Sequence, residues 1–130
     1  MSNGILVIAQ NLSNVNYVQQ AELLAMSLKA TNPNTKISLV TNNEVEFENL
    51  FDKIIPIPWN DDAKDSDWKI QNRWKLYHAS PYNKTIVMDT DMIVLQDISE
   101  WWKFLNNYKH HLSLLIDSKI LLKFLLYFYF

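Results

Sequence analysis

Two pairs of aspartates separated by one residue are the main candidates for chemistry in this chain: Asp89 with Asp91, and Asp65 with Asp67. Two carboxylates at this spacing can ligate a hard divalent cation and so bind a diphosphate. The spacing alone is weak evidence, because nine aspartates in 130 residues produce roughly 0.6 such pairs by chance. The sequence around each pair must therefore distinguish them.

The context favours Asp89 and Asp91. They lie between two apolar runs, residues 86–88 and 92–95, whereas the other pair lies in an acidic, polar loop where solvated charges and a helix cap explain it. Buried charge without compensation is costly, so two carboxylates between buried segments need an explanation. Ligands of open α/β sheets bind at the carboxyl ends of strands. We expect a cation carrying a diphosphate here; the alternative is that one aspartate caps a turn while the other faces solvent.

The elements that must position this motif alternate between strands and helices. Apolar, β-branched runs predict strands, and helical spacing or capping residues predict helices. The expected strands are residues 5–9, 36–41, 53–57 and 85–88, and the expected helices are residues 17–31, 44–51, 68–79 and 101–105. This order is typical of an α/β fold with a doubly wound, mainly parallel sheet. Pro56 indicates that the third strand lies at a sheet edge or stops early.

Composition excludes several function classes. The chain has no cysteine, which excludes disulfides, thiolate chemistry and cysteine-based zinc sites. Its single glycine, Gly4, excludes glycine-rich phosphate loops, so phosphate binding must use a metal or side chains. A net charge of −2 argues against nucleic acid as a partner. The chain opens without a secretory signal, so we expect a cytoplasmic location.

Residues 73–102 combine a basic helix, a short Pro/Tyr break, an apolar strand ending in D-x-D, a second apolar run, Asp-Ile and an acidic-aromatic helix. This stretch resembles the metal-site region of glycogenin-type glycosyltransferases, which are retaining nucleotide-sugar transferases of the GT-A fold. The likeness covers residues 4–106, at the level of pattern outside the stretch above. It implies a metal-dependent enzyme that moves a sugar from a nucleotide-diphosphate donor, expected to be a UDP-sugar, to a glycan, lipid or protein acceptor.

The resemblance also implies donor-binding roles for particular residues. Asp89 and Asp91 would hold Mn²⁺ or Mg²⁺ on the donor diphosphate, and Thr90 would lie along the ribose. Arg73 matches the basic residue that the family places in the preceding helix, and its neighbour Lys75 stays open as an alternative. Either cation would neutralise phosphate charge, and an arginine could do so with two hydrogen bonds.

The nucleotide base would lie at the end of the first strand. Ala9 and Asn11 would border the base, and Tyr17 would stack on it. The leaving diphosphate needs only charge stabilisation by the cation and the basic side chain, so we nominate no catalytic base.

The chain departs from the family in length, because such enzymes are usually about twice as long and add a histidine ligand in their second half. Here His110 and His111 lie in a polar stretch that is typical of a surface loop, and His78 is expected to be a partly buried helix residue. We therefore expect a donor-binding domain at residues 1–111 and a hydrophobic tail at residues 112–130, a truncated continuation of the same domain. Charges within the tail argue against a membrane anchor.

Two alternatives remain beside the transferase. A catalytically inactive nucleotide-sugar-binding fragment would keep the fold and lose turnover. A haloacid-dehalogenase-like phosphatase also uses D-x-D, but there the motif ends the first strand rather than the fourth. Trp59, Trp68 and Trp74 could stack on sugars, although tryptophans more often fill cores and edges. The residues predict no oligomeric state.

Overall fold

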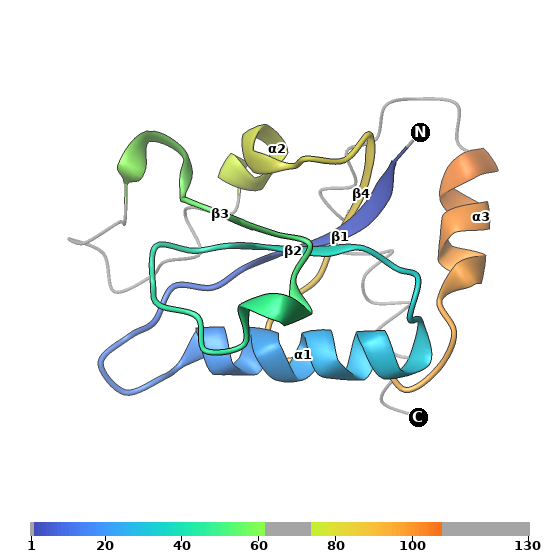
Figure 1. The fold of residues 1–130 in the computed structure, drawn as a ribbon. Coiled ribbons are helices and arrows are strands. Elements are labelled where there is room, and N and C mark those ends of the chain that lie inside the picture. Colours follow the sequence, from blue (N-terminus) through green and yellow to red (C-terminus); the bar gives the residue numbers. More distant parts are fainter. Residues whose placement is uncertain (1, 62–73, 108–130) are drawn as a thin grey trace.

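The computed structural model describes residues 2–61 and 74–107. Within them a sheet is formed by β1 (Asn3–Ile8), β2 (Ile37–Val40), β3 (Lys53–Ile55) and β4 (Lys84–Val87). Its strand order is β3-β2-β1-β4 and every neighbouring pair is parallel (Figure 1). The predicted α/β fold with a parallel sheet is confirmed, and β3 lies at an edge, as Pro56 indicates.

The main helix, α1 (Tyr17–Thr31), begins and ends where the sequence predicts. Asn16 caps its start, because the Asn16 Oδ1 accepts a hydrogen bond of 3.0 Å from the Gln19 amide. Asn32 follows its last turn, and its amide donates to the Leu28 carbonyl at 2.7 Å before Pro33 prevents a further turn. Local signals at both ends therefore fix this helix.

The expected helix at residues 44–51 is wrong: only a single 3-10 turn, η1 (Glu48–Leu50), forms there. The reason is a competing acceptor on α1. The buried carboxylate of Glu22 accepts hydrogen bonds from the amides of Glu46 and Phe47, at 2.9 and 3.0 Å. These bonds hold the chain in a turn against α1.

Two further helices complete the described fold. Of the expected helix at residues 68–79, the structure describes α2 (Leu76–Ala79), and residues 68–73 lie outside the described part. α3 (Ser99–Asn107) begins two residues earlier than predicted, because the Asp97 carboxylate accepts hydrogen bonds from the Ser99 amide and hydroxyl. These two bonds also hold the pKa of Asp97 below its usual range. No helix within the described ranges has the length and apolar character needed to cross a membrane.

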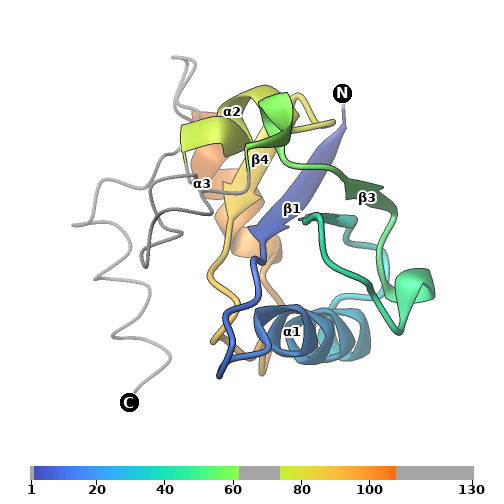
Figure 2. The same ribbon diagram turned by 90° about the vertical axis from the view of Figure 1, so that its left-hand side faces the viewer.

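Helices cover both faces of the sheet (Figure 2). Side chains alternate along β1, so that Ile5 and Val7 face one side and Leu6 faces the other. The first side packs against α1, and the second packs against Ile57 and the Leu76 side chain of α2. Each such buried aliphatic side chain contributes about 1.5–3 kcal/mol of hydrophobic stabilisation.

After β4 the chain runs along α1 from its first turns to its C-terminal end. Three hydrogen bonds fix this path: Thr90 to Gln20 at 3.0 Å, Val94 to Ser27 at 2.9 Å, and Ile98 to Asn32 at 2.9 Å. The path delivers α3 to the amino ends of the strands, where Lys84 donates to Asn106. Trp101 and Trp102 of α3 both pack against the core cluster that α1 and the sheet form.

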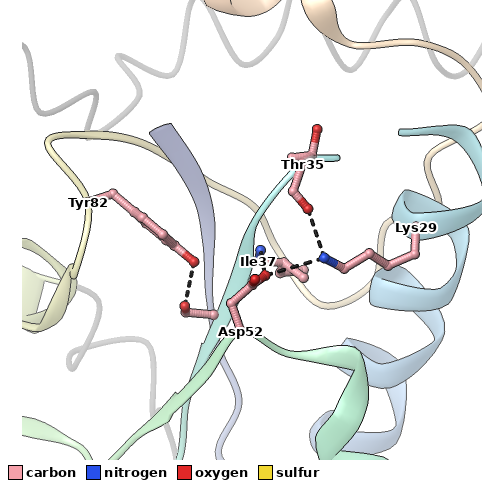
Figure 3. Close-up of polar contacts among 6 residues, drawn as sticks. Lys29, Thr35, Ile37, Asp52 and Tyr82 are labelled. Carbon is pink, nitrogen blue, oxygen red and sulfur yellow. Dashed lines mark hydrogen bonds and ion pairs between the residues drawn. The ribbon is translucent and has the colours of Figure 1, made fainter. Parts of the chain in front are cut away.

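The amino ends of the strands are joined by polar contacts (Figure 3). The Asp52 carboxylate accepts hydrogen bonds from the Ile37 amide at 2.8 Å and from the Lys29 ammonium at 3.3 Å. The same ammonium donates to the Thr35 carbonyl at 2.9 Å. One lysine thereby ties the last turns of α1 to the start of β2 and the residue before β3.

Gly4 is required where the chain before β4 crosses β1. The Tyr82 hydroxyl shares a hydrogen bond of 2.5 Å with the Ser38 hydroxyl of β2. The Tyr82 ring lies so close to Gly4 that a Cβ there would overlap it. The single glycine of the chain therefore serves a close approach of an aromatic ring to a strand.

Candidate functional site

Asp89 and Asp91 lie just beyond the carboxyl end of β4, beside the end of β1. Leu6 of β1 pairs with Val87 of β4, and the Met88 amide still donates to the Leu6 carbonyl at 3.1 Å. The two aspartates come directly after this last bond. β2 and β3 are added in turn on one side of β1, and β4 then lies on its other side, so the strand order reverses between β1 and β4. Such a reversal of strand order is the position where open α/β sheets bind ligands.

The loop that carries the two carboxylates is anchored on α1. Its middle residue, Thr90, donates a hydrogen bond from its hydroxyl to the Gln20 side chain at 3.0 Å. Asp89 is half-buried and Asp91 is exposed. The anchor therefore holds both carboxylates at the carboxyl edge of the sheet, with Asp91 open to solvent.

Asn11 connects three segments at this edge. Its amide donates to the Asn43 side chain at 3.0 Å, and its own side-chain oxygen accepts from the Val18 amide at 3.0 Å. Ala9 is buried, and its amide donates to the Val40 carbonyl at 3.0 Å. Both predicted base-bordering residues thus lie where β1 and β2 end, and Asn11 also fixes the start of α1.

Tyr17 opens α1 and packs partly against the core cluster. The amides of the first turn are already engaged within the chain: Val18 donates to Asn11, Gln19 to the Asn16 side chain and Gln20 to the Asn16 carbonyl. A helix N-terminus binds phosphate through such amides. Here they have partners, so side chains or a cation must neutralise a phosphate at this edge.

The structure describes only one of the two basic residues that were predicted to bind phosphate. Arg73 lies outside the described residues. The Lys75 side chain is buried, and its ammonium forms an ion pair of 2.7 Å with Asp61 and also contacts the Asp61 carbonyl at 3.3 Å. The Lys75 ammonium is therefore engaged with Asp61, in the chain that follows β3. The predicted role of Lys75 in phosphate binding stays a prediction.

Aromatic residues gather at the carboxyl end of β3, and here one expectation fails, the partial burial of His78. Of the two readings open for Trp59 and Trp74, core filling does not occur: both are more than half exposed, and their rings stack with centroids 5.3 Å apart. His78 is exposed rather than partly buried, and its ring meets both tryptophans edge-on. The turn η2 (Pro58–Asn60), which the sequence did not predict, carries Trp59, whose ring meets the His78 ring of α2 with centroids 5.1 Å apart.

Two residues of the site were not predicted, Gln20 and Asn43. Both make contacts across long stretches of sequence, to Thr90 and to Asn11. Asn43 had one local signal, since it follows a strand that ends at the same sheet edge. Gln20 had none beyond being a polar residue in a largely buried helix.

The described residues supply two carboxylates for a cation and no cluster of three or more acidic or histidine side chains. Magnesium-type cations are commonly held by one or two carboxylates together with substrate phosphates and water, so the Asp89–Asp91 pair fits such a cation when a diphosphate completes its coordination. His110, His111, Asp65 and Asp67 lie outside the described residues.

Comparisons with known proteins add no family assignment. No protein-family model matches the chain, and no curated protein matches it significantly. Any functional conclusion therefore has to come from the placement and chemistry of the residues described above.

Proposed function

We propose that this protein is a metal-dependent glycosyltransferase with a GT-A-type donor site, using a nucleotide-diphosphate sugar. The observation that carries the proposal is the position of Asp89 and Asp91, which follow β4 at the point where strand order reverses beside β1. Ligands bind at this position in open α/β sheets. Two oxygen ligands there suit a Mn²⁺ or Mg²⁺ ion carrying a diphosphate.

The surrounding residues support donor binding in distinct ways. Thr90, through its bond to Gln20, holds the two carboxylates in place. Asn11 and Tyr17 lie at the end of β1 and the start of α1, where a nucleoside would extend from the diphosphate. The α1 amides already have partners, which leaves phosphate charge to the carboxylate-bound cation and a basic side chain.

In the reaction, the bond between the anomeric carbon and the diphosphate oxygen breaks, and an acceptor hydroxyl oxygen forms the new bond. The acceptor hydroxyl gives up its proton to the oxygen of the departing nucleoside diphosphate. A bound divalent cation supplies Lewis-acid stabilisation of the charge that develops on the departing diphosphate. The chain's own carboxylates orient that group and need not react covalently.

The proposal is tested by calorimetric titration with UDP, GDP and CDP, each with Mn²⁺ and with excess EDTA. We expect one nucleotide to bind only with Mn²⁺, and we expect binding to be lost in Asp89→Asn and Asp91→Asn. Glu48→Gln is the matched control, because Glu48 is an exposed carboxylate in η1, away from the site. Absence of Mn²⁺-dependent binding for all three nucleotides, in folded protein, contradicts the proposal.

Turnover separates an enzyme from a binding fragment. With the sugar conjugate of whichever nucleotide binds, we expect release of the nucleoside diphosphate, and faster release when oligosaccharide acceptors are added. Binding without any release would favour the inactive nucleotide-sugar-binding protein. Hydrolysis of a simple phosphate ester that is abolished by Asp89→Asn would favour a phosphatase.

A further inference from the structure

A cluster of exposed rings follows β3 and continues onto α2; we call Trp59, Trp74, Tyr77 and His78 the aromatic shelf. Trp59 and Trp74 are stacked at 5.3 Å with planes 26° apart. The His78 ring stands edge-on against both, at 5.1 and 5.9 Å, and the Tyr77 ring stands edge-on against His78 at 5.3 Å. Each ring is braced by a neighbour, so the shelf is preorganised.

The side chains of the aromatic shelf are exposed to solvent, whereas tryptophan and tyrosine side chains are usually buried to a large extent. The exposed fractions are 64% for Trp59, 52% for Trp74 and 63% for Tyr77. A stacked pair covers one face of each ring, and these fractions leave the outer faces accessible. Trp59 is the more exposed indole, with Trp74 behind it.

The backbone of Trp59 is strained. Its φ and ψ are 61° and 14°, the left-handed region that bulky residues rarely adopt, and Asn60 follows with φ 53°. Such strain persists only where the surroundings impose it and is concentrated at functional sites. The chain here places a large indole on the surface in a conformation that glycine would adopt without cost.

Hydrogen-bonding groups flank the rings. The Lys75 ammonium lies 5.9 Å from the centre of the Trp74 ring and pairs with the Asp61 carboxylate at 2.7 Å. The indole N–H groups and the His78 imidazole add donors and an acceptor. The shelf therefore combines flat apolar faces with polar groups beside them.

We propose that the aromatic shelf binds the pyranose rings of an oligosaccharide, which makes a glycan the acceptor class of the proposed transferase. The apolar C–H face of a pyranose ring packs flat on an indole, while its equatorial hydroxyls point sideways to polar groups. This matches the exposed Trp59 face, which has the His78 ring beside it and the exposed Asp61 carboxylate two residues further along the chain. That the bound glycan is an acceptor rests on the proposed transferase function. That the shelf binds a glycan rests only on the geometry of the shelf.

Other occupants fit less well. Fully exposed aromatic side chains offer about 150–250 Å² each, so the three half-exposed rings offer roughly 300–400 Å². A stable dimer buries about 800 Å² per partner, which the shelf does not provide. Single-stranded nucleic acid also stacks on aromatic rings but needs a positively charged groove, and Lys75 is already paired with Asp61.

The shelf and the aspartate pair share one edge of the sheet. η2 follows the carboxyl end of β3, and the aspartates follow that of β4. Three strand spacings separate β3 from β4, a lateral distance of about 14 Å. A short oligosaccharide held on the shelf can therefore extend toward the donor side.

Calorimetric titration with cellohexaose, maltoheptaose and chitohexaose, without nucleotide or Mn²⁺, tests the inference. We expect at least one to bind, and Trp59→Ala to weaken it by at least about tenfold. Trp59→Gly separates binding from folding: relief of the backbone strain offsets the lost ring contacts, so we expect a melting temperature close to that of the parent with binding lost. Leu95→Ala, which trims another exposed apolar side chain, is the control and should bind normally.

Three results would overturn the inference. The first is no binding of any of the three oligosaccharides, and the second is binding that Trp59→Gly leaves unchanged. The third is displacement of the oligosaccharide by UDP alone, which would make the shelf a nucleotide site. The oligosaccharide titration contains neither Mn²⁺ nor nucleotide, so the two proposals fail separately. If the protein binds Mn²⁺ with a nucleotide but no oligosaccharide, only this inference is rejected. If it binds an oligosaccharide but no Mn²⁺-dependent nucleotide, only the proposed donor function is rejected.

Discussion

The two edges of the sheet carry polar residues of similar kinds and use them differently. At the amino edge, Lys29 and Asp52 pair with each other and with backbone groups, and Tyr82 pairs with the buried Ser38 hydroxyl. At the carboxyl edge, the anchored loop presents Asp91 to solvent. Both edges use polar side chains to join segments, but the carboxyl edge also presents a carboxylate, that of Asp91, to solvent.

This difference follows from parallel topology. Every β-to-α connection begins at the carboxyl edge, so the chain there consists of loops, and loops carry binding residues more often than the elements that they connect. At the amino edge the chain returns from α1 to β2 and from η1 to β3, and short connections bring polar groups together. We expect substitutions at the amino edge to change stability and those at the carboxyl edge to change binding.

The largest stability effect is expected for Gly4→Ala. The added Cβ overlaps the Tyr82 ring, and overpacking of this kind costs about 1–3 kcal/mol of unfolding free energy. Urea unfolding measures the loss. The same substitution in a Tyr82→Ala background should cost clearly less, because the ring is gone; an equal cost in both backgrounds would show that the ring is not the cause.

Tyr82→Phe should have the next largest effect, about 1–2 kcal/mol, because it leaves the fully buried Ser38 hydroxyl without its partner. It should also change the pH dependence. Burial raises the pKa of Tyr82 above its ordinary value of 10.0, with Asp52 adding to the rise and the Ser38 hydrogen bond opposing it.

The sign of that pH dependence follows from proton binding. Above pH 10 the unfolded chain loses the phenolic proton before the folded chain does, so stability present below pH 10 falls as the pH rises through the folded pKa. Unfolding measured from pH 8 to 11 should show a steeper decline for the parent than for Tyr82→Phe. Parallel pH profiles would contradict the assignment.

The smallest stability effect is expected at the carboxyl edge, for Thr90→Val. Loss of its hydrogen bond to Gln20 should cost about 0.5–1.5 kcal/mol. Because that bond holds the aspartate loop, the affinity for Mn²⁺–nucleotide should fall several-fold in calorimetric titration. Gln20→Leu should reproduce both changes. Unaltered affinity in both variants would show that the hydrogen bond between Thr90 and Gln20 does not position the aspartates for binding.

Sequence patterns predicted the parts of the fold that local forces determine. α1 has a capping asparagine and a terminating proline within reach of its own backbone, so its bounds were correct. The position of the two aspartates after a strand could also be predicted, because a polar pair between apolar runs indicates the end of a strand. Pro56 predicted that β3 lies at an edge or stops early, and β3 both ends at Ile55 and lies at an edge of the described sheet.

Other features depend on contacts that no local pattern encodes. The turn at η1 forms because the Glu22 carboxylate, more than 20 residues earlier in the chain, accepts hydrogen bonds from two backbone amides just before it. The left-handed backbone at Trp59 occurs without glycine, and the contact of its indole with the His78 ring forms only because the folded chain brings η2 beside α2. The anchor of Thr90 on Gln20 joins residues 70 positions apart, so only the folded chain reveals it.

The most direct test of the difference between the edges compares Asp91→Asn with Asp52→Asn in thermal unfolding, with and without Mn²⁺ and saturating nucleoside diphosphate. A ligand at 100 times its dissociation constant adds about 2.7 kcal/mol, a shift on the order of 10 °C. We predict that Asp91→Asn keeps the parent melting temperature and loses the ligand-induced shift, whereas Asp52→Asn melts lower and keeps it. A full ligand-induced shift in Asp91→Asn would contradict the account.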